Sequence, residues 1–293
     1  MILSWWLATD AAGAINFLKC ANNPGMVGEL YPSGNLKTPD VHAEVFKQLT
    51  DSLKISKVTE VDFSSCGIGP VALGHLSDWV RDATGAVTSI NCLHNPLGEA
   101  VHIIIKVFEE TPRLRTLCGF EEGVEQIDWS KSQKGPVEVA LLAADLKAGR
   151  AIGAVTSVNC LNNPLGQAVQ ILIKVFEETP RLRTLCGFEE GVEQIDWSKS
   201  QKGPVEVALL AADLKAGRAI GAVSSLAISG NFIFGTKVLN AGKWNQETVH
   251  DVDKDQSGWN NLCEQLKGSN ITSFIASDIG MGPVALRTLA TSL

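Results

Sequence analysis

The feature that most constrains this chain is a tandem duplication. Residues 87–154 and 155–222 are nearly the same sequence written twice. The two copies differ at five pairs of positions: Ile90/Val158, His94/Asn162, Glu99/Gln167, His102/Gln170 and Ile104/Leu172. A copy at a fixed period is typical of repeat architectures, in which each unit contacts mainly its neighbours. An enzyme pocket is usually built once, so the duplication favours an extended surface over a single reaction centre.

A shorter pattern recurs inside and outside the two copies. It reads apolar-x-x-apolar-x-apolar-x-x-Asn/Ser/Cys and is clearest at 58–66, followed by Gly67 and a helix-like stretch at 71–80. Alternation with a period of two predicts a short strand, and 3.6-residue spacing predicts the helix after it. A proline after glycine, as at Gly135-Pro136, suits a first helical position. Further occurrences begin at Ile15, Val87, Val124, Val155, Val192, Val223 and Ile271.

From about Ile15 to Leu293 this pattern resembles leucine-rich repeats of the ribonuclease-inhibitor-like class. The resemblance implies an α/β fold: one horseshoe-shaped solenoid over residues 1–293, with parallel strands on the concave face and helices on the convex face. Polar stretches at about 25–39 and 242–256 are then insertions. In this family an asparagine side chain bonds the backbone of the turn after each strand. The matching positions are Asn23, Asn95, Asn163 and Asn231, whereas Cys66, Ser132 and Ser200 occupy the slot elsewhere.

Some segments need separate predictions. Leu114–Cys118 and its copy Leu182–Cys186 are either extended connectors or irregularly paired strands, and we favour connectors because a parallel crossover needs more residues. Trp129 and Trp197 fall at inward strand positions and are expected in the core, as is the helix carrying Val101 and 103–105. A second, longer-range repeat relates 42–73 to 258–286.

The sequence offers little for catalysis or metal binding. The string Asp251–Gly258 resembles a calcium loop, but Gln256 and Leu262 stand where such a loop needs glycine and a bidentate acid. We therefore expect no useful calcium affinity there, and helix capping instead. Histidines are exchanged between the copies, and no nucleophile, phosphate-loop or zinc-protease motif is present. We predict no enzyme activity, no cofactor and no metal.

Composition sets the compartment and the partner class. Hydrophobic residues make up 45% of the chain, enough for a continuous core. A net charge of −7 and a pI near 5.3 give no reason to expect nucleic acid or membrane as a partner. The seven cysteines include no CxxC, and residues 1–14 lack the basic start of a signal peptide. Reduced thiols and a cytoplasmic location are the expectation.

The predicted function rests on the strand positions that point away from the core. These should form a polar, mildly acidic surface, with Leu93 and Leu161 as apolar spots, that binds another protein. The candidate binding residues are Glu60, Asp62, Gln126, Asp128, Gln194 and Asp196, with Ser89, Asn91, Ser157, Asn159 and Ser225 between them.

Three alternatives stay open for the function. The face is solvated and has no partner; the chain is an assembly subunit that stacks through its solenoid ends; or it is an enzyme regulator, or an enzyme with a site in the inserted loops. Neither end of the chain resembles a polar capping unit. We therefore expect either a fragment of a longer protein or an end covered by association.

Overall fold

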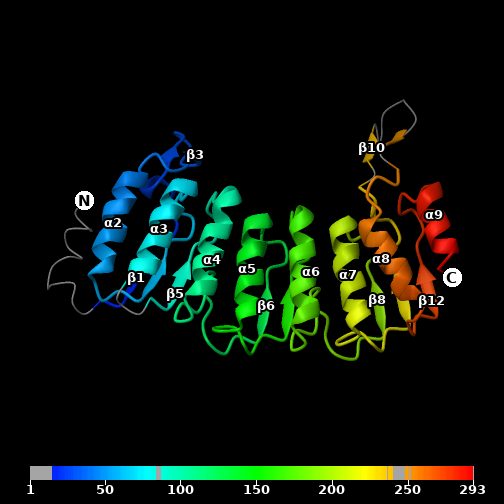
Figure 1. Cartoon of the computed structure of the whole chain (residues 1–293). Helices are drawn as coiled ribbons and strands as arrows, with labels where there is room; N and C mark the ends of the chain where they lie inside the picture. Colours follow the sequence, from blue (N-terminus) through cyan, green and yellow to red (C-terminus); the bar gives the residue numbers. More distant parts are fainter. Residues whose placement is uncertain (1–14, 84–86, 236, 240–247, 251, 293) are drawn as a thin grey trace. The chain divides into compact units, whose positions relative to one another are not determined.

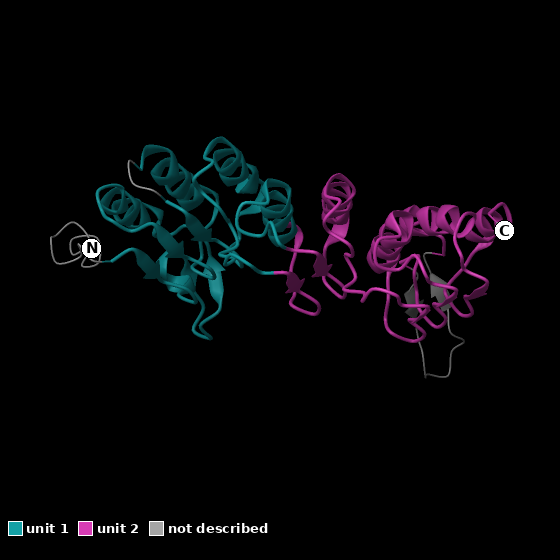
Figure 2. Ribbon diagram, turned by 90° about the horizontal axis from the view of Figure 1, so that it is seen from below, with its two compact units in different colours: residues 1–124, 137–154 teal, residues 125–136, 155–293 magenta. Residues whose placement is uncertain are grey.

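The chain folds into helices and short strands arranged as two compact units. The computed structural model describes residues 15–83, 87–235, 237–239, 248–250 and 252–292. Unit 1 is formed by residues 1–124 and 137–154, and unit 2 by residues 125–136 and 155–293 (Figure 2). The predicted α/β class is confirmed. A single solenoid over residues 1–293 stays a prediction.

Unit 1 contains a parallel sheet covered by helices. Its strands lie in the order β1-β4-β5, with Leu18, Val61 and Ile90 in register. The helices run side by side along one side of this sheet (Figures 1 and 2). The strands are β1 (Phe17–Lys19), β4 (Glu60–Asp62) and β5 (Ser89–Asn91); the helices are α2 (Ala43–Lys54), α3 (Pro70–Asp82), η3 (Gly98–Ala100), α4 (Val101–Glu110) and α5 (Pro136–Ala148).

Unit 2 repeats this strand–helix order. Two parallel sheets are present, β6-β7 and β8-β9-β12, the second with β9 in the middle. Its strands are β6 (Gln126–Asp128), β7 (Ser157–Asn159), β8 (Gln194–Asp196), β9 (Ser225–Ala227) and β12 (Ser273–Ile275). Its helices are η4 (Gly166–Ala168), α6 (Val169–Glu178), α7 (Pro204–Ala216), α8 (Ser257–Leu266) and α9 (Pro283–Ala290).

The first predicted insertion contains an antiparallel strand pair, and a second such pair begins at Lys237, before the predicted insertion at 242–256. In unit 1, η2 (Pro24–Met26) precedes the hairpin of β2 (Glu29–Leu30) and β3 (Leu36–Thr38). In unit 2, β10 (Lys237–Leu239) pairs with β11 (Thr248–His250). Residues 242–247 and 251 of the second insertion lie outside the described residues, as do residues 1–14 at the start.

Strand alternation places the core where the sequence predicts it. In β4 to β9 the middle residue of the strand is buried and its neighbours are more exposed; Val61, Ile127 and Ile195 are at most 5% exposed. Trp129 and Trp197 are buried, which confirms their core assignment. Helix α4 buries Ile104 but leaves Ile103 39% exposed, so the prediction of a wholly buried cluster was wrong. A helix that packs against the core on one side faces water on the other, and Ile103 lies on the side that faces water.

An asparagine after β1, β5, β7 and β9 bonds the turn, as expected. Asn95 donates to the carbonyls of Phe63, Cys92 and Leu93, and its Oδ1 accepts from the N–H groups of Cys66 and Ile68. Asn163 and Asn231 make corresponding bonds in unit 2. Asn23 donates to the carbonyls of Cys20 and Ala21. Asn95, Asn163 and Asn231 are buried, and their amides satisfy backbone groups that the short strands leave unpaired, whereas Asn23 is exposed.

Leu114–Cys118 is not a plain connector, so that preference was wrong. The segment pairs irregularly with β5: Ile90 and Cys92 donate to the carbonyls of Thr116 and Leu117, and Arg115 donates to that of Thr88. Residues 182–186 pair with β7 in the same way. Leu114 and Leu117 are completely buried. The two leucines hold the segment against the core. Isolated bridges form in place of a regular ladder, because too few residues separate this segment from the next strand for a parallel crossover.

The calcium-like string contributes a helix cap. Asp253 accepts hydrogen bonds from the N–H groups of Gly282 and Val284 at the start of α9, and Asp255 accepts from Ser257. In unit 1, Asp40 caps the start of α3 at the same sequence separation, which supports the longer-range repeat. Capping was expected from Asp255, Ser257 and Gly258, but the role of Asp253 was missed. Weak calcium affinity stays a prediction.

Two further findings concern membrane-spanning helices and the cysteine thiols. None of the described helices has the length and apolarity needed to cross a bilayer. All seven cysteines are free thiols, and burial raises the pKa of Cys66 and Cys160 to about 12.

Candidate functional site

The predicted binding residues point away from the core on the strands of both units. Glu60 and Asp62 lie on β4 in unit 1, whereas Gln126, Asp128, Gln194 and Asp196 lie on β6 and β8 in unit 2. All are exposed except Asp62, which is partly buried. Leu93 and Leu161 are only 8% exposed, so the expected apolar spots on this face are absent among the described residues. The turn after the strand folds both leucines inward.

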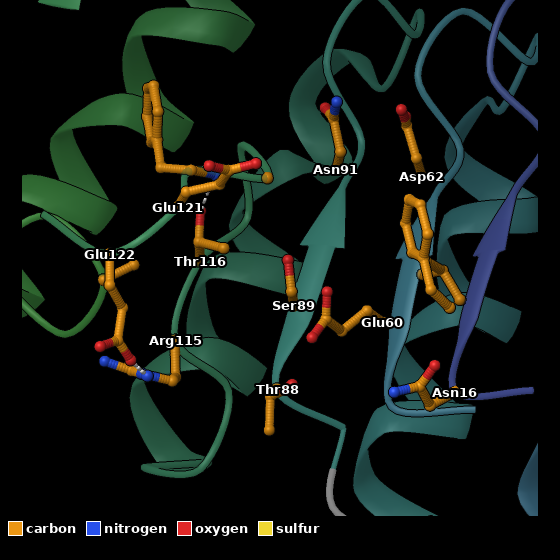
Figure 3. A pocket seen from close by; sticks show the side chains of 15 residues that line it. Asn16, Glu60, Asp62, Thr88, Ser89, Asn91, Arg115, Thr116, Glu121 and Glu122 are labelled. Atoms are coloured by element: carbon orange, nitrogen blue, oxygen red, sulfur yellow. Dashed lines mark hydrogen bonds and ion pairs between the residues drawn. The ribbon is translucent and has the colours of Figure 1, made fainter. Parts of the chain in front are cut away.

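The strand face of unit 1 carries a hollow, which we call the first hollow. It has a volume of about 570 Å³ and lies over β1, β4 and β5, beside residues 115–122 (Figure 3). Figure 3 shows Glu60 and Ser89 on neighbouring strands and Thr116, Glu121 and Glu122 across from them. The lining residues are Asn16, Phe17, Glu60, Val61, Asp62, Thr88, Ser89, Asn91, Arg115, Thr116, Gly119, Phe120, Glu121, Glu122 and Ala151.

A buried carboxylate holds the wall formed by residues 115–122. Asp145, on α5, accepts hydrogen bonds from the Thr116 hydroxyl at 2.6 Å and from the N–H groups of Leu117 and Cys118. The Thr116 hydroxyl oxygen in turn accepts from the N–H of Phe120. Asp145 is fully buried, and this burial raises the pKa of its carboxyl to about 6 despite the donors around it.

Gly119 lets this wall approach the strand. Its φ is +69°, and a Cβ there would lie 2.8 Å from that of Asn91. Both conditions favour glycine. The Arg115 guanidinium forms an ion pair with Glu122 and donates to the carbonyl of Arg150. The rim of the first hollow is therefore braced by side chains that also line it.

The second copy builds a corresponding hollow in unit 2, which we call the second hollow. It has a volume of about 390 Å³. Asp213 repeats the role of Asp145, with Thr184 Oγ1 at 2.6 Å and a pKa raised by burial to about 6. Arg183 pairs with Glu190. The lining residues are Gln126, Thr156, Ser157, Arg183, Thr184, Gly187, Phe188, Glu189, Glu190 and Ala219.

The two hollows differ in the strand that borders them. Glu60 and Asp62 of β4 line the first hollow, and only Gln126 of β6 lines the second. Phe17, which is 51% exposed, lines the first hollow as well. Asp128, Gln194 and Asp196 line neither of these two hollows. The first hollow is therefore the more acidic, and it has an accessible aromatic ring.

Half of the predicted binding residues have a local structural role. Asp128 and Asp196 accept hydrogen bonds from the N–H groups of Ser130 and Ser198, two residues on, and these serine donors lower the pKa of both carboxyls. Asp62 accepts from Ser64 in the same way. Such Asx turns reverse the chain after each strand. Within the described part of the chain, Glu60, Gln126 and Gln194 make no side-chain hydrogen bond and remain available to a partner.

Sequence reasoning missed the wall of each hollow. Arg115, Phe120 and Glu122 were not candidates, because 114–118 was placed in a connector and the strand pattern ends before it. The signal available was the exact duplication of 115–122 at 183–190. Duplication alone does not tell wall residues from core residues, so only their pairing with β5 and β7 identifies them.

A larger open hollow, about 1060 Å³, lies in unit 2 at the N-terminal ends of α6, α7 and α8. Pro204, Val205 and Ala208 of α7 line it together with Asn260 and Asn261 of α8. Helices α7 and α8 approach closely because Gly258 lies against the Pro204 carbonyl. The described residues contain no group of three or more His, Cys, Asp or Glu side chains that could hold a metal ion.

Comparisons of the sequence with known proteins identify no family for this chain. No protein-family model matches the chain, and no curated protein matches it. Among solved structures, a glucosidase from Croceicoccus marinus is similar over 91% of this chain, with 12% sequence identity and a TM-score of 0.21. The chain spans 60% of the length of that structure. A TM-score this low supports no argument about fold or activity.

Proposed function

We propose that this chain is a non-catalytic leucine-rich-repeat protein that binds a partner protein on the strand face of its units. The observation that carries the proposal is the recurrence of a polar, open hollow at equivalent positions of the two copies. A surface built twice from the same residues suits recognition by repeated contacts. Concave, partly polar hollows are also where proteins bind ligands and segments of partners.

The solenoid itself is part of this proposal. Support comes from the parallel strands in register, the helix after each of them and the buried asparagines that bond the turns after β5, β7 and β9. The seven free cysteines favour the cytoplasm as the place where it acts. The side chains lining the two hollows include neither histidine nor cysteine, and each arginine there is paired with a glutamate. Their lining therefore offers no histidine- or cysteine-based catalytic centre.

One observation favours an alternative. Helix α9 exposes Val284 and Leu286, 54% and 57% accessible, and apolar exposure of this kind is typical of interaction surfaces. An assembly subunit would use that helix rather than the strands. Regulation of an enzyme is a special case of the leading proposal, because it would also use the strand face.

The test reverses the chemistry of the strand face without disturbing its turns. Glu60→Lys, Gln126→Lys and Gln194→Lys are combined, and the Asp residues of the Asx turns are kept. The control is Glu99→Lys with His102→Lys, exposed positions outside the strands and outside the three hollows. Proteins captured from native extract by the wild type are quantified by mass spectrometry. Partners that are lost with the strand variant and retained by the control support the proposal.

Equal capture by the strand variant and the control would contradict a strand-face site. Capture that is instead abolished by Val284→Asp with Leu286→Asp would favour the assembly subunit. Circular dichroism and thermal unfolding of each variant establish that the fold is retained, since all five positions changed to Lys are exposed.

A further inference from the structure

The strand face of unit 1 is unpartnered in the described structure, and its charge is one-sided. Four carboxylates line the first hollow, those of Glu60, Asp62, Glu121 and Glu122. The one arginine that lines it, Arg115, is already paired with Glu122. Lys19 reaches Asp62 only at 3.9 Å, with its own side chain 65% exposed. Glu60 and Glu121 have no cationic partner among the described residues, so the face attracts a positive group.

The first hollow has the shape and surface for a planar cation. Phe17 and Phe120 line it, and a guanidinium can stack on an aromatic ring while its N–H groups bind a carboxylate. Side-chain oxygens of Asn16 and Ser89 provide further acceptors near Glu60, and Asn91 lies beside Asp62 (Figure 3). A lysine ammonium would satisfy one carboxylate as a point charge but would not match the ring and the carboxylate together.

We propose that the first hollow docks an arginine side chain from a basic, extended segment of the partner protein. The inference rests on the proposed strand-face function and specifies the chemistry of its partner. The second hollow binds such a segment more weakly, because Gln126 is its counterpart of Glu60 and no counterpart of Phe17 or Asp62 lines it. The chain thus contains its own low-charge comparison site.

The probe is a fluorescently labelled peptide of alternating serine and arginine, eight residues long, compared with the same peptide carrying citrulline in place of arginine. Citrulline keeps the planar shape and removes the charge. Fluorescence anisotropy gives the Kd at low and at physiological salt. We expect the arginine peptide to bind at least tenfold tighter than the citrulline peptide, with an advantage that shrinks as salt rises.

Two substitutions exchange the key side chain between the hollows. Glu60→Gln should weaken arginine-peptide binding about threefold, in line with loss of one partly exposed charge pair. Gln126→Glu should strengthen binding at the second hollow about threefold, and that hollow should stay the weaker of the two because it has no counterpart of Phe17 or Asp62. The matched control is Glu99→Gln, which removes one exposed carboxylate outside the hollow and copies the residue found at 167. It should leave the Kd unchanged.

Photo-crosslinking identifies the place of binding. A peptide carrying a diazirine group should label the tryptic fragment 58–81, which occurs once in the chain, whereas 115–122 is duplicated and cannot be assigned. Labelling there, together with the Glu60→Gln effect, supports the inference. Equal Kd values for the two peptides, no effect of Glu60→Gln, or an equal effect of Glu99→Gln would each overturn it.

The inference and the proposed function fail separately. If the triple lysine variant loses captured partners but no arginine preference is found, the strand face binds a partner of different chemistry and only the inference falls. If neither captured partners nor peptides depend on the strand face, both fall.

Discussion

The two copies, 87–154 and 155–222, build the same local structure from nearly the same sequence. Buried differences are conservative: Ile90/Val158 and Ile104/Leu172 are all fully buried apolar residues. The polar differences Glu99/Gln167 and His102/Gln170 are exposed. His94 and Asn162 both have a positive φ, 57° and 58°, a conformation that these residue types tolerate better than most. The differences between the copies therefore follow burial and backbone conformation.

The hollows nevertheless differ, and the cause is the neighbouring strand. Thr116, Phe120 and Glu122 of the first hollow have identical counterparts in the second. What changes is the strand on the other side, Glu-Val-Asp at 60–62 against Gln-Ile-Asp at 126–128. The comparison teaches that a duplicated copy keeps its internal hydrogen-bond network, while its binding surface depends on the strand that precedes the copy and lies beside it.

The largest effect is expected from the buried asparagines. Asn95→Ala removes five hydrogen bonds to buried backbone groups, and Asn163→Ala removes four corresponding ones. We expect each to lower the free energy of unfolding by about 3–5 kcal/mol, because the backbone groups stay buried without partners. Urea unfolding followed by circular dichroism measures this. Losses that differ by more than about 2 kcal/mol between the copies would break the equivalence.

A slightly smaller effect is expected in the pH dependence of the free energy of unfolding. Burial raises the pKa of Asp145 and Asp213 to about 6, against about 3.9 in the unfolded chain. The folded state therefore holds these protons more tightly, so the stabilisation is complete below pH 4 and is lost as pH rises through 6. The loss is about 3 kcal/mol for each carboxyl at most.

The comparison that isolates this term is wild type against Asp145→Asn and against Asp213→Asn. Other acids, such as Asp128 and Asp196, have a lowered pKa and act in the opposite direction, so the difference between wild type and variant is the quantity to follow. It should change between pH 4 and 7, and equally in both copies. A difference that is flat across this range would contradict the raised pKa.

An intermediate effect is expected from Arg150 and Arg218, which donate hydrogen bonds to carbonyls at the C-terminal ends of α4 and α6. Arg150 donates to the carbonyls of Phe108, Thr111 and Leu114, and its guanidinium lies 4.4 Å from the Phe108 ring. Arg218 repeats these contacts, with 4.7 Å to Phe176. We expect Arg150→Ala and Arg218→Ala each to cost about 2 kcal/mol. Lysine at either position should recover less than half, because it lacks the planar fork.

The smallest effect is expected where the copies already differ in the core. Ile90→Val should cost about 0.5–1.5 kcal/mol by removing one buried methylene. Val158→Ile should change stability by less, and in either direction, because the second copy has packed around valine. Thermal unfolding of both variants, with His102→Gln as a surface control expected within about 0.5 kcal/mol, sharpens the comparison. A large cost for Val158→Ile would show that the two cores have diverged.

Several features could be predicted from the sequence because they depend on local pattern. Strand alternation located Val61, Ile127 and Ile195 in the core, and the Gly-Pro pair located the starts of α3 and α7. The turn-bonding role of Asn95 followed from the resemblance. The outward strand positions followed from the period of two, although the exposed face became a site only where a wall stands beside it.

The sequence by itself determined the repeat, the order of strand and helix within each unit, and which residues of a strand face the core, since each is encoded in spacing along a few residues. Only the tertiary structure decided that 114–118 pairs with β5, that Asp145 and Asp253 cap backbone groups about thirty residues away, and that β4 makes the first hollow acidic. Those contacts join segments far apart in the chain. Their hydrogen bonds and charges depend on distances in space, which periodicity does not encode.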